Sequence, residues 1–243
     1  IAQAFSGVAL LIYVYKKVPL FALKAKEFVF DGKLMLTALK LAIPSSLQQV
    51  FVALGFVVFQ RLINSFGETV IAGVTAAARV DQLAVIPLMT IGMALATFAA
   101  QNVGAGDIER AKKGYWRTIL ISLACCVFLS AAILIFGKMI ISKFIPNNPE
   151  AVAIGTQYII VVGCFYLLFS IMNSSNSFIR GVGDVTFSTI ITIVAFGSRI
   201  ILAYSLKGYL GYSAIWWSMP SGWLIAAIMG QVRYFSGAWT KKA

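Results

Sequence analysis

An uninterrupted apolar run from Leu83 to Ala100 limits most strongly what this chain can fold into. At a rise of about 1.5 Å per residue, a helix of roughly 18 residues crosses most of the hydrocarbon core of a bilayer. The run is followed by the segment Gln101–Gly106, whose glycines permit the left-handed backbone of a helix stop. Asp107 then stands where it can cap a new, basic helix. The pattern predicts a transmembrane helix that ends in a tight turn.

The composition indicates the same class of protein for the whole chain. Hydrophobic residues make up 60% of the sequence and charged residues 12%, whereas a soluble domain has roughly 25% charged residues. The net charge of +12 does not predict nucleic-acid binding, because Lys and Arg stand in short connectors beside apolar runs. Cys125, Cys126 and Cys164 lie within apolar runs and the chain has no His, so no metal or redox site is expected. The sequence predicts an all-α polytopic membrane protein.

Seven apolar segments follow one another along the chain. Residues 1–15 are shorter than the roughly 20 residues that a span needs, so we interpret them as the end of a helix that began further upstream and expect the chain to be a fragment. Residues 16–40 carry several lysines and are interpreted as a cytoplasmic connector, followed by a six-helix transmembrane lobe over 41–235 and a cytoplasmic tail over 236–243. The predicted spans of the lobe are 41–66, 69–100, 118–141, 151–179, 186–206 and 213–235.

The basic residues are divided unequally between the two ends of these spans. Most of the 20 Lys and Arg residues fall in the first connector, after the third span, at Arg180 and at the C-terminus. The opposite ends receive Arg61, Arg79, Lys138, Lys143 and Lys207. Because connectors rich in Lys and Arg remain in the cytoplasm, we expect a multi-pass protein of the cytoplasmic membrane with a cytoplasmic C-terminus.

Polar side chains interrupt two of the predicted spans. Gln48 and Gln49 lie in the first span of the lobe, where they either line a path for substrate or hydrogen-bond to neighbouring helices. In the fourth span of the lobe, Tyr166, Ser170, Asn173 and Ser177 follow one another at helical spacing and share one face, with Asn176 beside them. This stripe either faces the same path or packs against another helix, and the sequence leaves both interpretations open.

Asp81 is an acidic residue set within an apolar part of the chain. An ionisable group at membrane depth is costly and usually functional, although a structural ion pair near the outer mouth of the lobe is an alternative. Arg79 is an unsuitable direct partner, because residues two positions apart point to different sides of a helix. Arg61 or Arg199 from another helix fits better, unless Arg199 extends its side chain towards the outer interface instead. Arg180–Asp184 is interpreted as a structural turn.

Several short motifs occur in the order and at the spacing of the second half of a known transporter family. They are Ile43–Gln49, Ile63–Gly67, Gln101–Ala111, Arg180–Asp184 and Arg199–Ile200. On these motifs, which extend over nearly all 243 residues, the chain resembles the multidrug and toxic compound extrusion (MATE) transporters.

The resemblance implies one lobe of a twelve-helix MATE-type fold, preceded by part of the sixth helix. It implies an antiporter, not an enzyme, that exports small amphipathic organic cations across the cytoplasmic membrane in exchange for H⁺ or Na⁺. The expected partners are the lipid bilayer and a missing N-terminal six-helix half, with no cofactor besides the coupling ion. The candidate substrate or ion pathway comprises Gln48, Gln49, Arg79, Asp81, Tyr166, Ser170, Asn173, Asn176 and Arg199.

Two acidic residues of the family's NorM-like branch have no counterpart in this sequence. That branch carries a Glu near the position of Val52 and an acid near Phe169 or Ser170, and neither stretch contains a carboxylate here. The chain is therefore more similar to DinF-like members, whose coupling carboxylate is an Asp on the first helix. Two other functions are alternatives: a flippase of lipid-linked saccharides from the same superfamily, and a membrane scaffold without transport activity.

Overall fold

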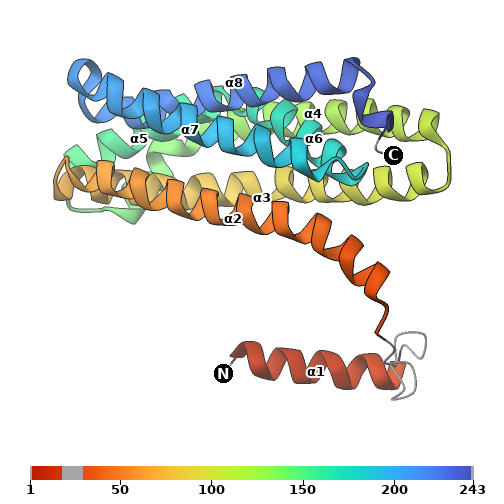
Figure 1. Cartoon of the computed structure of the whole chain (residues 1–243). Helices are drawn as coiled ribbons and strands as arrows, with labels where there is room; N and C mark the ends of the chain where they lie inside the picture. Colours follow the sequence, from red (N-terminus) through yellow and green to blue (C-terminus); the bar gives the residue numbers. More distant parts are fainter. Residues whose placement is uncertain (1, 18–29, 242–243) are drawn as a thin grey trace. The chain divides into compact units, whose positions relative to one another are not determined.

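The computed structural model describes residues 2–17 and 30–241, and these residues form helices without any strand (Figure 1). The chain divides into two compact units, residues 1–40 and 41–243, which are considered separately. The first unit contains α1 (Ala2–Lys17), which ends on Lys16 and Lys17. Residues 18–29 of the predicted connector and residues 242–243 of the predicted tail lie outside the described part of the chain.

The remaining helices follow in chain order. They are α2 (Gly32–Asn64), α3 (Glu68–Gly104), α4 (Ile108–Phe144), α5 (Pro149–Cys164), α6 (Tyr166–Gly181), α7 (Val185–Leu210) and α8 (Ala214–Phe235), with the 3-10 turns η3 (Gly211–Ser213) and η4 (Ala238–Lys241). α2 begins before the expected start of the span at residue 41, because Asp31 caps it. One carboxylate oxygen of Asp31 accepts hydrogen bonds from the backbone N–H groups of Lys33 at 2.8 Å and Leu34 at 3.2 Å.

Four stretches of the described chain are long and apolar enough to cross a membrane, namely Gly32–Asn64, Glu68–Gly104, Ile108–Phe144 and Val185–Phe235. The bent pair α5 and α6 adds a fifth. The last stretch turns back at Gly211, where φ is 57°, so α7 and α8 lie side by side (Figure 1). They run antiparallel, because Asp184 before α7 bonds to Arg233 at the end of α8. When α7 and α8 are counted separately, the described chain has six crossing segments in the lobe. The predicted all-α membrane bundle is confirmed.

The turn between α3 and α4 has the predicted chemistry. α3 ends at Gly104, and Gly106 adopts φ 79°, a backbone conformation that favours glycine. The side chain of Asp107 then accepts a hydrogen bond of 2.9 Å from the backbone N–H of Arg110. The predicted helix stop and the predicted N-cap are both present. The basic helix and the following span form one continuous helix, α4.

The predicted span 151–179 is wrong in one respect, because it is broken. α5 and α6 meet at Phe165 at an angle of 54°. Side chains of α4 donate hydrogen bonds to backbone carbonyls on both sides of the break. Ser130 donates to the carbonyl of Gly163 at 2.7 Å, and the thiol of Cys126 donates to the carbonyl of Tyr166 at 3.3 Å.

The interior of the lobe is built around α3, which packs against α4, α5 and α6. The largest buried cluster includes Leu62, Ala77 and Leu88. A second cluster gathers aromatic rings from several helices at the end of the lobe where α8 ends. Its members include Tyr115, Phe178, Tyr234 and Trp239. Trp239 belongs to η4, so part of the predicted tail packs onto the lobe, and its indole N–H donates to the carbonyl of Tyr234 at 3.0 Å.

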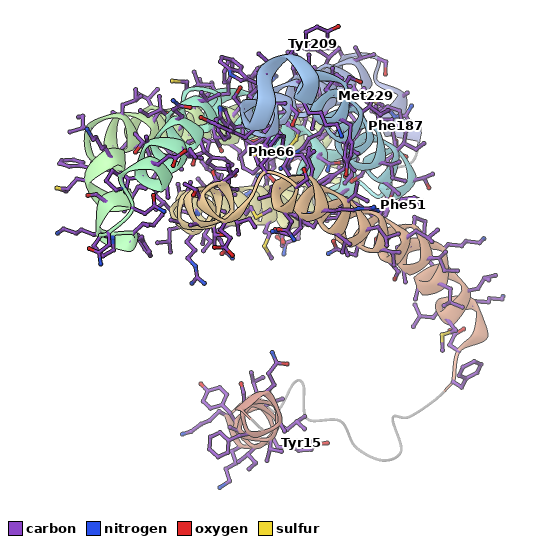
Figure 2. The ribbon with its side chains drawn as sticks, turned by 90° about the vertical axis from the view of Figure 1, so that its left-hand side faces the viewer. Tyr15, Phe51, Phe66, Phe187, Tyr209 and Met229 are labelled. Atoms are coloured by element: carbon purple, nitrogen blue, oxygen red, sulfur yellow. The ribbon has the colours of Figure 1, made fainter. Side chains whose placement is uncertain are left out.

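α6, α7 and α8 form the third buried cluster, against which Phe187 and Met229 pack (Figure 2). Tyr209 near the end of α7 points away from the bundle and is 91% exposed (Figure 2). α2 is the least buried of the spans: its buried residues, Gly55, Phe59, Leu62 and Ile63, all lie in its last third.

Candidate functional site

Asp81 lies well inside α3 and is half-buried. The hydroxyl of Tyr166 donates a hydrogen bond of 2.7 Å to its carboxylate. Tyr166 is fully buried and is the first residue of α6, so the break at Phe165 determines where this hydroxyl lies. Asp81 therefore contacts the point at which the broken span changes direction.

The positive charge of Arg199 on α7 acts on this carboxylate. Its guanidinium carbon lies 4.0 Å from the centre of the Phe59 ring and 5.8 Å from that of Phe196, within the range of cation–π attraction. Arg199 and Asp81 nevertheless do not form an ion pair within 4.0 Å. In the described chain, ion pairs at that distance join Glu109 to Lys112 and Asp184 to Arg233. Of the sequence candidates, Arg199 is the cation whose charge acts on Asp81, whereas Arg61 and Arg79 are exposed.

A second polar group joins three helices. The side-chain N–H of Gln48 on α2 donates to the hydroxyl of Thr192 on α7 at 2.7 Å, and that of Asn176 on α6 donates to the same oxygen at 3.3 Å. The side-chain oxygen of Asn176 is buried and has no hydrogen-bond partner among the described residues. Gln49 is exposed. Gln48 and Asn176 thus meet at the hydroxyl of Thr192, and Gln49 takes no part in this contact.

The predicted stripe on α6 faces α3. Asn173 donates to the carbonyl of Leu88 at 2.9 Å, and a side chain added at Gly92 would collide with Asn173 and lie 2.8 Å from the hydroxyl of Ser177. Ser170 is also buried, at 1% exposure. These contacts correspond to the packing interpretation, whereas Asn176 donates to Thr192 on α7.

Some polar contacts of the lobe could not be read from the sequence. Tyr115, Ser175 and Gln231 form a buried network in which Gln231 donates to the Tyr115 hydroxyl at 2.9 Å. Asp184, interpreted as a turn residue, accepts two hydrogen bonds from Arg233 at 2.8 and 2.6 Å and is almost fully buried. Thr192 offered one signal, because it lies two helical turns before Arg199 and so shares its face.

An open groove of about 660 Å³ runs along α6 and α8. It is lined by Leu168, Ile171, Leu224, Ala227, Ile228, Gln231, Val232, Phe235 and Ser236. None of the candidate pathway residues lines this groove. The lobe therefore has two distinct features: polar contacts in its interior around α3, α6 and α7, and an apolar groove on the α6–α8 face.

Among the acidic residues that the structure describes, Asp81 alone lies more than one turn inside a helix. A carboxylate can accept a proton or hold a monovalent cation, and a hydroxyl donor fixes the direction of one of its oxygens. Gln48, Asn176 and Thr192 offer neutral donors and acceptors. The arrangement suits the passage or binding of a small solute.

Comparison with known proteins gives the same type of molecule. The MatE family model matches residues 44–205, which is more than half of the chain. The chain is 27% identical over 202 residues to the "Probable multidrug resistance protein YpnP" of Bacillus subtilis, covering 83% of this chain and 45% of the relative. It is 23% identical over 246 residues to the "Probable multidrug resistance protein NorM" of Thermotoga maritima, covering 100% of this chain and 53% of the relative.

The fold agrees with a solved structure described as the outward-facing conformation of a multidrug resistance MATE family transporter of the MOP superfamily. The TM-score is 0.87 at 20% identity, with 98% of this chain and 55% of that chain covered. The chain thus spans about half the length of the curated relatives that it matches. From the family match and the six-segment helical lobe, the chain belongs to the MatE family, whose members are multi-pass membrane transporters and not enzymes.

Proposed function

We propose that this chain forms one lobe of an antiporter that exports amphipathic organic cations across the cytoplasmic membrane in exchange for H⁺ or Na⁺. The observation that carries the proposal is the carboxylate of Asp81, which lies inside a membrane-spanning lobe and is bonded by Tyr166 of the broken span. Coupled transport needs such a group, because its ion occupancy must differ between the two access states. The names of the relatives support export of drug-like compounds.

A second lobe completes the proposed transporter. Alternating access in transporters of this kind arises when one repeat moves against the other around a site between them, and the chain covers about half of its relatives. We propose that the other half supplies a further coupling carboxylate. The absence of acidic residues around Val52 and from Phe169 to Ser170 supports a place in the DinF-like branch. The concentration of Lys and Arg at one end of the spans supports a cytoplasmic C-terminus.

The test is reconstitution in liposomes with an imposed proton or sodium gradient and a fluorescent cationic dye. We expect gradient-driven movement of the dye when this chain is combined with a separately expressed N-terminal half, and none with either half alone. Asp81→Asn should lower that movement while the protein still inserts into the membrane, because the variant removes the charge and little volume. Transport by this chain alone, or undiminished transport by Asp81→Asn, would contradict the proposal.

A further inference from the structure

The groove along α6 and α8 has the shape and lining of a site for a hydrocarbon chain. Its volume is about 660 Å³, and most of its lining side chains are aliphatic or aromatic. Ile228, Val232 and Phe235 on α8 are 54%, 62% and 68% exposed, so the groove opens outward along one face of the helix. An elongated apolar groove on a membrane-spanning lobe favours an acyl chain over a polar solute.

One end of the groove adjoins an aromatic side chain of a third helix. Phe235 lines the groove, and its ring centre lies 6.1 Å from that of Trp116 on α4. Trp116 also contacts Tyr234, at 6.0 Å between ring centres, and is 45% exposed. Exposed tryptophans near the ends of spans typically lie at the level of lipid headgroups. This end of the groove is therefore expected to lie at the membrane interface.

Two basic residues without an ion-pair partner within 4.0 Å lie next to Trp116 on α4. Lys113 and Arg117 are one helical turn apart, and both are exposed. Their neighbour Lys112 is paired with Glu109 at 2.8 Å, whereas no carboxylate lies within 4.0 Å of Lys113 or Arg117 in the described part of the chain. A basic pair beside an interfacial tryptophan is complementary in charge to a phosphate group of a lipid.

We propose that this face binds one anionic phospholipid. An acyl chain occupies the groove along α6 and α8, the phosphate of the headgroup lies between Lys113 and Arg117, and Trp116 contacts the glycerol region between them. The apolar groove alone would accept any lipid, and the basic pair alone would accept any anion. The groove and the basic pair are connected by the contact between Phe235 and Trp116. A negatively charged phospholipid fits both features, because it carries an acyl chain and a phosphate. The proposal does not depend on transport activity.

The experiment measures lipid binding to the purified protein in detergent by native mass spectrometry. The probes are phosphatidylglycerol and phosphatidylcholine with identical acyl chains, and glycerol phosphate without chains. The headgroup variant is Lys113→Gln with Arg117→Gln. Its matched control is Lys138→Gln with Lys143→Gln, which removes two exposed charges from the other end of the same helix. Val232→Trp fills the groove, and Val127→Trp places the same bulk at a position on α4 that is 61% exposed.

We expect phosphatidylglycerol to bind about tenfold more tightly than phosphatidylcholine, and the headgroup variant to remove that preference. The lysine control should keep it. Val232→Trp should weaken binding of both lipids, while Val127→Trp should not, and circular dichroism should show unchanged helicity in all variants. Equal affinity for the two lipids, equal effects of a variant and its control, or glycerol phosphate binding as tightly as the lipid would overturn the proposal. A dimer that Val232→Trp dissociates would overturn it too, because a second copy would then occupy the groove.

Discussion

The hydroxyl of Tyr166 lies 2.7 Å from a carboxylate oxygen of Asp81, and this contact connects two residues that are 85 positions apart in the sequence. It joins the middle of α3 to the first residue of α6. One hydrogen bond therefore holds both the carboxylate proposed for coupling and the point at which the broken span changes direction. A variant that removes only this hydrogen bond therefore tests the role of the Asp81 carboxylate and leaves the packing around it in place.

Tyr166→Phe should lower export and reduce thermal stability, because it leaves the partly buried carboxylate of Asp81 without its donor. Loss of one partner of a buried polar contact costs about 1–3 kcal/mol. Tyr158→Phe is the matched control: Tyr158 is also buried, but its hydroxyl bonds weakly to the sulfur of Met219 at 3.5 Å. Dye export and thermal melting in detergent measure both effects. Equal losses for the two variants would show that the hydrogen bond from Tyr166 to Asp81 contributes no more than the weak contact of Tyr158 with sulfur.

Thr192→Val should change which drugs the complete transporter exports more than it changes the overall rate. The hydroxyl accepts hydrogen bonds from both Gln48 and Asn176, so its removal frees two amide groups on α2 and α6. Rate measurements over a set of cationic dyes would reveal the altered profile. Thr156→Val is a control, because that hydroxyl bonds within its own helix to the carbonyl of Val152. An unchanged profile would assign the three residues to packing.

Gly92→Ala should destabilise the lobe by about 1–3 kcal/mol, as expected when bulk is added to a tightly packed contact. The new methyl group would collide with Asn173 and approach Ser177 on α6. Gly197→Ala adds the same methyl group to α7, where nothing beyond the backbone of its own helix lies within 4 Å, and should stabilise the protein by about 0.5–1 kcal/mol through helix propensity. Melting temperatures of both variants provide the comparison. A neutral Gly92→Ala variant would mean that α3 and α6 can separate slightly without cost.

Asp184→Asn should destabilise the protein by about 3 kcal/mol, because it leaves the charge of Arg233 without its partner in a mostly buried site. Side-chain exposure in this pair is 3% for Asp184 and 21% for Arg233. Adding Arg233→Gln to Asp184→Asn should cost less than the sum of the two single changes. Glu109→Gln breaks the exposed pair with Lys112 and should leave the melting temperature unchanged. Additive effects at Asp184 and Arg233 would contradict a coupled pair.

Cysteine labelling should confirm the orientation of the lobe. In a variant without the native cysteines, Ala105→Cys should react with a membrane-impermeant reagent only from the cytoplasmic side, and Asn147→Cys only from outside. Both positions are exposed and lie at opposite ends of α4. Substitution at Ala105 also leaves the side chain of Asp107, which caps α4, in place. Reaction of both positions from the same side would contradict the six-segment topology.

The sequence predicted those features of the fold that depend on local chemistry. The spans follow from apolar runs, and the end of α3 follows from Gly106 and Asp107, whose roles depend on neighbours within a few residues. The break at Phe165 escaped prediction because a single Gly within an apolar run, here Gly163, does not by itself indicate the end of a helix. Donors from α4, Ser130 and Cys126, stabilise it, and their proximity depends on the tertiary fold.

The site was predicted less completely for the same reason. Polar residues within apolar runs identified Gln48, Asp81, Asn176 and Arg199, but not which of them meet. Asp81 was expected to need a cation from another helix, and its hydrogen-bond donor is a tyrosine of the predicted stripe. The pair of Asp184 and Arg233 was missed because the two residues are 49 positions apart and each alone resembles an ordinary end-of-helix residue.

The burial pattern of α2 gives this helix two unequal ends. Phe59, Leu62 and Ile63 anchor its last third in the core, whereas residues from Leu41 to Leu54 are held to α7 mainly by two single hydrogen bonds, from Gln48 to Thr192 and from Thr189 to the carbonyl of Pro44. Backbone amides at the Pro44 end should therefore exchange with solvent deuterium at a far lower opening cost than those near Phe59. We therefore expect α2 to open first at its Pro44 end, while Phe59, whose ring lies beneath Arg199, stays packed in the core.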